Sequence, residues 1–159
     1  EDFDAVGGFD TSYWPGEDTI LCLKLTKQLG KRIVYDPAVR VHHHRREVFG
    51  GHLRQIRSYA LHRGFFARKF PATSLKASYF VPSAFTLFVF AGWLPGLVCP
   101  SMLILWASVM TLYAVLALLF SLKTIHPIGI MGILAGTFLT HITYGMWFVA
   151  GLAASELAD

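Results

Sequence analysis

Three long runs without a charged side chain dominate the second half of this chain and limit what it can fold into. They cover residues 79–98, 101–122 and 128–154. A helix of roughly 20 residues crosses the ~30 Å hydrocarbon layer of a bilayer. Pro100 and Pro127 lie between the runs, where a residue without an N–H interrupts a helix at least cost. We therefore expect a three-helix transmembrane region over residues 77–159.

Basic residues are concentrated before these runs. Residues 1–76 hold 13 of the 14 Lys and Arg, and residues 40–76 hold nine of them against one acid, Glu47. By the positive-inside tendency, this basic segment lies in the cytoplasm. We expect a multi-pass protein of the plasma (inner) membrane with a cytoplasmic N-terminal segment. Three crossings would then place Glu156 on the opposite side.

The first residue is Glu1 rather than Met, so we expect a longer natural protein. The ~75 residues before the first span bury too little surface for a large enzyme domain. Any chemistry that resides in this segment therefore needs further residues.

Residues 17–30 have the pattern of a helix, with acids in the first turn, basic residues near the end and Gly30 just beyond. On a helical wheel, Asp18 shares a stripe with leucines and Glu17 lies on the flank. Asp18 is therefore predicted to point into the protein and Glu17 toward water. An inward carboxylate at a helix start can satisfy free N–H groups, or it can act as a general base at a cleft.

Two segments after Gly30 are strand-like, residues 32–35 and 39–41, with a turn at Asp36-Pro37 between them. A run of three histidines follows at residues 42–44. On an extended chain His43 takes the side opposite to its two neighbours. The run therefore indicates a solvated basic patch near an anion more than a self-contained zinc site.

Residues 48–76 are predicted to form a basic amphipathic helix at the membrane interface. Phe49, Leu53 and Ile56 lie on its apolar face, and arginines lie on its flank. In the third span, Gly132 and Gly136 form a G-x-x-x-G motif that allows close helix packing, within the protein or between two copies. His141 in the same span needs a bonding partner on a neighbouring helix or has a functional role.

The order of motifs resembles a known enzyme family. Val6-Gly7-Gly8-Phe9-Asp10, Gly16-Glu17-Asp18, the helix LCLKLTKQLG, the segment RIVYDP and a His-rich VHHH follow one another. This succession resembles the acceptor-side half of the nucleotide-sugar-binding domain of family 2 glycosyltransferases, the GT-A fold. The resemblance implies an α/β fold, with residues 1–47 as the C-terminal part of that domain.

The resemblance also implies an inverting transfer, in which an acceptor hydroxyl displaces a nucleoside diphosphate from the anomeric carbon of a sugar. Asp18 matches the second residue of the E-D motif and would be the base, and Glu17 beside it would bind substrate. Gly7, Gly8 and Asp10 match the G-G-F-D segment and would contact substrate. His43 resembles a residue that lies by the diphosphate and a divalent metal, Mg or Mn, in some relatives.

Two features depart from the family pattern. The D-x-D motif that holds the metal is absent, because the chain starts downstream of its expected place, so the main metal ligands are expected in a missing N-terminal half. Gln55-Ile-Arg-Ser-Tyr59 resembles the Q-x-x-R-W of processive synthases without its arginine and tryptophan. Gln55 is thus a substrate-binding candidate, and processive synthesis is not favoured.

The expected function is that of a membrane-bound glycosyltransferase. Its expected partners are a nucleotide-sugar donor, a lipid-linked or glycan acceptor and membrane lipids, with no nucleic acid. A transferase acting on polyprenyl phosphate is the nearest alternative, and it would need arginines such as Arg57 and Arg63 more than a base. A non-catalytic lipid-binding membrane module also fits the composition.

Overall fold

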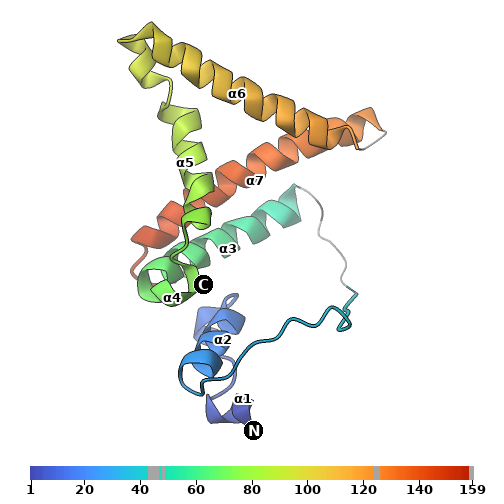
Figure 1. Cartoon of the computed structure of the whole chain (residues 1–159), viewed down its shortest axis with the longest axis vertical. Helices are drawn as coiled ribbons and strands as arrows, with labels where there is room; N and C mark the ends of the chain where they lie inside the picture. The colour runs from blue at the N-terminus through green and yellow to red at the C-terminus, as the bar shows by residue number, and fades with distance from the viewer. Residues whose placement is uncertain (43–46, 48, 124–125, 158–159) are drawn as a thin grey trace.

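The part of the chain that the structure describes is helical wherever it is regular. The computed structural model describes residues 1–42, 47, 49–123 and 126–157. In chain order the helices are α1 (Asp2–Ala5), the 3-10 helix η1 (Thr11–Tyr13), α2 (Glu17–Lys27), α3 (Gly50–Lys69), α4 (Pro71–Ser74), α5 (Ala77–Ala91), the 3-10 helix η2 (Leu94–Leu97), α6 (Pro100–Ser121) and α7 (Pro127–Ala153). Figure 1 shows α3 lying along α7, with α5 crossing both.

The expected α/β fold is wrong, because the residues that the structure describes contain no strand. Residues 32–35 and 39–41 are irregular, and every residue from 31 to 42 is exposed, including Val34 and Tyr35. Strand-forming residues adopt a strand only when a neighbouring strand and a packed face are available, and no described segment supplies either. The turn is confirmed, since the Val39 N–H donates to the Asp36 carbonyl at 3.2 Å.

Within the described ranges, three helices are long and apolar enough to cross a membrane, as expected. They are Ala77–Leu97, which includes η2, Pro100–Ser121 and Pro127–Ala153. α7 has 27 residues, or about 40 Å, so it is longer than a ~30 Å hydrocarbon layer requires. Its last turns therefore have length to spare for packing beyond the apolar layer.

α3 and α7 form the largest helix contact, and they run parallel. His52 contacts Thr140 near one end of the pair, and the Arg68 guanidinium donates to the Ala154 carbonyl at the other. Gly64 and Gly151 allow this close approach. A Cβ on Gly64 would lie 2.8 Å from the Leu152 nitrogen, and one on Gly151 would lie 2.8 Å from the Leu61 carbonyl carbon.

α5 packs on α7 in the antiparallel direction. Phe80 contacts Phe148, with ring centroids 4.9 Å apart, and the Ser83 hydroxyl donates to the Gly145 carbonyl at 3.0 Å. α6 joins them at their middle through Tyr113, whose hydroxyl lies 3.0 Å from His141 Nδ1. The expected helix partner of His141 is therefore present.

This arrangement differs from three simple alternating crossings, which would make α5 and α7 parallel. The C-terminal end of α7 instead lies at the starting end of α5, and Ala154 and Leu157 pack against Phe65 and Phe66 of α3. The tail that was expected on the opposite side thus lies beside the basic segment. The cause is the pair of close glycine contacts that bind the last turns of α7 to α3.

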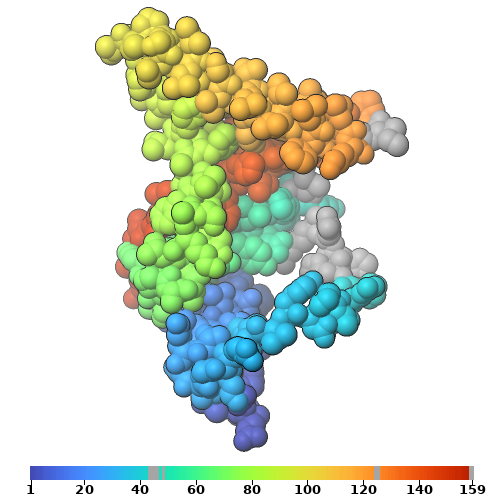
Figure 2. Space-filling view, viewed as in Figure 1, coloured from blue at the N-terminus to red at the C-terminus, as the bar shows by residue number. Residues whose placement is uncertain are grey.

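The N-terminal residues dock on the second half of α3 through aromatic rings. Tyr13 makes edge-to-face contacts with Phe66 and Phe70, at centroid distances of 5.8 and 5.5 Å. Ile20 of α2 is buried in the same cluster. Figure 2 shows this N-terminal part at one end of the molecule, with the turn between α5 and α6 at the other.

Candidate functional site

Asp18 lies at a cavity of about 290 Å³ between the start of α2 and the second half of α3. The lining residues are Pro15, Gly16, Asp18, Thr19, Tyr59, His62, Arg63 and Phe66. Half of the lining thus comes from the segment that carries the Glu17-Asp18 motif. The other half comes from the helix that packs along α7, so we call this the Asp18 cavity.

The rotation of α2 differs from the wheel prediction. Asp18 is exposed rather than inward, and Ile20 is the buried residue of α2. Glu17 is half-buried, and its Oε2 is buried with no hydrogen-bond partner among the described residues. The contact at Gly16 sets this rotation, since a Cβ there would lie 2.6 Å from the Phe66 ring, and Ile20, one turn on, faces α3 as well.

The Asp18 carboxylate keeps one oxygen for a ligand. Its Oδ1 accepts hydrogen bonds from the Thr19 N–H at 2.6 Å and from the Thr19 hydroxyl at 3.3 Å. Asp18 forms no ion pair with any described residue. The carboxylate is therefore oriented by its own helix start, while Oδ2 remains available to accept a proton or a hydrogen bond.

His62 contributes an oriented imidazole to the α3 wall. Its Nδ1 lies 2.8 Å from the Ser58 carbonyl oxygen, which can only accept, so Nδ1 carries the hydrogen. In the neutral ring Nε2 is then an acceptor. This Nε2 is buried and has no partner among the described residues, which leaves an unsatisfied polar atom beside the cavity.

Arg63 supplies the positive charge at the Asp18 cavity. Its guanidinium lies over the Tyr79 ring of α5, 4.7 Å from the centroid, and it has no acidic partner in the described part of the chain. Six residues earlier on α3, the Arg57 guanidinium lies over the Trp147 ring, 3.8 Å from the centroid. Such stacking fixes a guanidinium without neutralising it, so Arg63 can still bind an anion.

Gln55 reaches the site through Tyr59. The Gln55 side-chain amide donates to the Tyr59 hydroxyl at 2.9 Å, and Tyr59 lines the cavity. The Tyr59 hydroxyl keeps its own hydrogen for a ligand. Gln55 therefore lies behind the cavity wall and orients a residue that lines it.

The structure does not bring the G-G-F-D residues to Asp18. Gly7 and Gly8 form a turn with φ of +78° and +66°, a conformation that favours glycine. Asp10 caps η1, where its Oδ1 accepts from the Ser12 hydroxyl, and this bond lowers the pKa of Asp10 below its usual value. Asp10 lines a separate cavity with Lys24 and Lys27.

The described residues offer no set of metal ligands. No group of three or more His, Cys, Asp or Glu side chains within residues 1–42, 47, 49–123 and 126–157 could hold a metal ion. His43 lies outside the residues that the structure describes. The residues placed here therefore do not fit a divalent-metal site.

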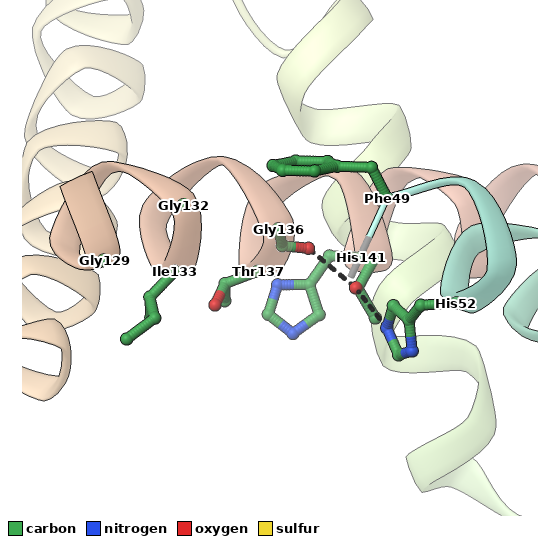
Figure 3. Close-up of a pocket in the computed structure, with 9 residues that line it drawn as sticks. Phe49, His52, Gly129, Gly132, Ile133, Gly136, Thr137 and His141 are labelled. Atoms are coloured by element: carbon green, nitrogen blue, oxygen red, sulfur yellow. Dashed lines mark hydrogen bonds between the residues drawn. The ribbon is translucent and has the colours of Figure 1, made fainter. Parts of the chain in front are cut away.

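A second cavity, of about 530 Å³, lies on α7 beside the start of α3. It is lined by Phe49, His52, Gly129, Gly132, Ile133, Gly136, Thr137, Thr140 and His141, and we call it the α7 groove. Figure 3 shows its glycines in successive turns of α7 and its two histidines at one end. His52 Nε2 lies 3.1 Å from the Thr140 hydroxyl, which donates to the Gly136 carbonyl at 2.7 Å.

Sequence reasoning missed His52 and His62 and the grouping of Tyr59 with Asp18. The sequence did indicate that these residues share one side of the helix, because Tyr59 and Arg63 are one turn apart and His52 is two turns before Tyr59. Comparisons with protein-family models, with curated proteins and with solved structures each returned no match. A functional assignment therefore depends on the geometry of the site and on the motif order in residues 6–18.

Proposed function

We propose that this chain is part of a membrane-bound inverting glycosyltransferase. It moves a sugar from a nucleotide-sugar to a hydroxyl of a lipid-linked or cell-envelope glycan, at the cytoplasmic face of the plasma membrane. The observation that carries the proposal is the position of Asp18, a carboxylate with a free oxygen in a cavity whose other wall packs on a helix that is long and apolar enough to cross a membrane. The resemblance of Gly16-Glu17-Asp18 and Gly7-Gly8 to the family 2 motifs supports the same assignment.

Asp18 is the base in this proposal. As the acceptor oxygen attacks the anomeric carbon, its O–H bond breaks and the proton passes to the Asp18 carboxylate. A new bond forms between that oxygen and the anomeric carbon. The bond from the carbon to the donor's diphosphate breaks with its electron pair, which leaves with the nucleoside diphosphate. Such proton transfer contributes roughly 10²–10⁴-fold to a rate.

Two arginine–aromatic pairs near the site support an acceptor held by a membrane lipid. Arg57 over Trp147 and Arg63 over Tyr79 are arginine–aromatic pairs, a combination typical of the boundary between hydrocarbon and water. Both arginines belong to α3, the helix that forms one wall of the Asp18 cavity. A glycan carried by a lipid would present its hydroxyls at this level.

The test is sugar transfer from radiolabelled nucleotide-sugars to lipid extract, with membranes that carry the full-length protein. Asp18→Asn keeps the shape and the hydrogen bond from Thr19 but cannot take up a proton, so transfer should fall by about 10²–10⁴-fold while donor binding is retained. Asp36→Asn is the matched control, because Asp36 is an exposed carboxylate outside the cavity. Unchanged transfer by Asp18→Asn would remove Asp18 as base.

Arg63 supports a second candidate function, that of a transferase whose acceptor is polyprenyl phosphate. That acceptor is already an anion and needs no base, and Arg63 is an unneutralised cation at the cavity. Transfer that survives Asp18→Asn but is lost in Arg63→Gln would support this candidate. No transfer from any donor by the intact protein would instead favour the non-catalytic membrane module.

A further inference from the structure

A cavity of about 370 Å³ between α2 and the end of α3 gathers lysines from both helices. Lys24 and Lys27 of α2 line it, together with the rings of Tyr13 and Phe70. The Lys69 ammonium group of α3 lies 5.3 Å from the centroid of the Tyr13 ring and 5.8 Å from that of the Phe70 ring. Three ammonium groups therefore meet around two aromatic rings, and we call this place the lysine cavity.

The lysine cavity has an excess of positive charge. Among the described residues that line it, Asp10 alone is acidic. The Ser12 hydroxyl lowers the pKa of Asp10, and the charges of Lys24 and Lys69 lower it further, so both ammonium groups lie near this carboxylate. None of the three lysines forms an ion pair within the part of the chain that the structure describes. An anion can therefore bind here and neutralise the remaining charge.

The lysine cavity lies beside the start of the first apolar helix. Ala77–Leu97 has 21 residues, or roughly 31 Å, so a crossing of the ~30 Å hydrocarbon layer uses its whole length. The residues just before it, α4 and Phe70, then fall in the polar headgroup layer. α2 packs on the same segment, because Lys27 and Thr73 of α4 line one cavity together, and Figure 1 shows α2 close to α4.

The surroundings suit a negatively charged bilayer surface. Leu75, between α4 and α5, is 57% exposed, which provides an apolar side chain at the same level. Residues 48–155 contain no Asp or Glu, so no carboxylate of this long segment repels an anionic headgroup. By the positive-inside tendency, this side of the membrane is the one whose leaflet carries anionic lipid.

We propose that the lysine cavity binds the phosphate of an anionic phospholipid headgroup. Lys24 and Lys27 contact the phosphate from α2 and Lys69 contacts it from α3, so one headgroup bridges the two helices. The aromatic rings hold the Lys69 ammonium group in place. A zwitterionic headgroup carries its own ammonium group beside the phosphate, so the site selects lipids with a net negative charge. The bound lipid ties α2, the helix that carries Asp18, to the membrane surface, whatever chemistry occurs at Asp18.

The test is hydrogen exchange of α2 in the full-length protein. The protein is reconstituted in vesicles of phosphatidylcholine alone, or of phosphatidylcholine and phosphatidylglycerol in equal parts. Local opening of α2 separates Lys24 and Lys27 from Lys69, so a bound headgroup slows this opening. Each lysine near an anionic surface strengthens binding about fivefold, so exchange over residues 20–27 should slow at least about fivefold with phosphatidylglycerol. The slowing should disappear in about 1 M salt, where the Debye length is ~3 Å.

Charge variants show whether the lysine cavity is responsible. Lys24→Gln with Lys27→Gln should lose the slowing, since glutamine keeps the helix propensity of lysine and removes its charge. Lys24→Arg with Lys27→Arg should keep it. The matched control is Arg32→Gln with Arg40→Gln, which removes the same charge from exposed positions outside the lysine cavity and should leave the slowing unchanged.

Three results would overturn the inference. Equal exchange in the two kinds of vesicle would mean that no anionic lipid binds at α2. Equal loss of slowing in the arginine control would mean that the whole basic segment is attracted to the membrane, without a site at the lysine cavity. Slowing by inorganic phosphate in phosphatidylcholine vesicles, as large as that by phosphatidylglycerol, would mean that the ligand is a soluble phosphate.

Discussion

Replacing Gly64 by alanine should loosen α3 from α7. The new Cβ would lie 2.8 Å from the Leu152 nitrogen and 3.0 Å from the Phe148 carbonyl carbon, and it would also meet the Phe148 carbonyl oxygen. Ordinary contacts begin near ~3.5 Å, so the helices must separate by at least about 0.5 Å along a well-packed interface. Overpacking of this kind costs about 1–3 kcal/mol.

The assay is thermal unfolding of the full-length protein in detergent, followed by tryptophan fluorescence. For a domain of this size each kcal/mol shifts Tm by about 2–4 °C, so a cost of about 1–3 kcal/mol in Gly64→Ala should lower Tm by roughly 2–12 °C. Gly132→Ala is the control, since its Cβ meets nothing. Its Tm should stay level or rise, because alanine favours a helix over glycine.

A double variant tests the mechanism. Gly151→Ala opposes Leu61 and Phe65 across the same interface, so one separation of the helices relieves both clashes. The Tm loss of Gly64→Ala with Gly151→Ala should therefore be clearly smaller than the sum of the two single losses. The close-packed α3–α7 contact would be refuted if Gly64→Ala had the same Tm as Gly132→Ala, or if the Tm losses of the two single variants were strictly additive.

Two further predictions follow from the packing. The first uses a background with Cys22→Ser and Cys99→Ser, into which Ser155→Cys or Ala72→Cys is introduced. Because the end of α7 lies beside α3, both cysteines should react with a membrane-impermeant maleimide added on the same side of the membrane. Reaction from opposite sides would support three alternating crossings. Gly16→Ala should push against the buried Phe66 ring and speed hydrogen exchange of α2, and Phe66→Leu should partly restore protection, whereas unaltered exchange in Gly16→Ala would exclude this contact as the dock.

The helical framework follows from local pattern. Runs of apolar residues with Pro100 and Pro127 between them specify the three apolar helices, and the 3.6-residue period specifies the helix before them. These features depend on residues close in sequence. The helix over residues 17–27 was predictable for the same reason, from its acids at the start and basic residues at the end.

The rest depends on contacts between distant residues. Residues 32–35 have strand composition, but a strand also needs a partner that composition does not reveal. The inward side of α2 is set by Gly16 against Phe66, fifty positions away, so the wheel gave Asp18 the wrong direction. Gly64 and Gly151, which join α3 to α7, belong to no short motif. The cavity at Asp18 could be anticipated only in part, because its α3 wall depends on that docking.

The partnership of α3 with α7 has a consequence for biosynthesis. Residues that meet in this pair, such as His52 and Thr140, are 88 positions apart. At about 5–20 residues per second, α7 leaves the ribosome roughly 4–18 s after α3. During that interval the apolar residues of α3, Ala60, Phe65 and Ala67, lack their final partner. The interior of the nearby bilayer is then the apolar environment in which they can be buried. Delivery of the nascent chain to the membrane before α3 is complete would thus protect this segment from aggregation.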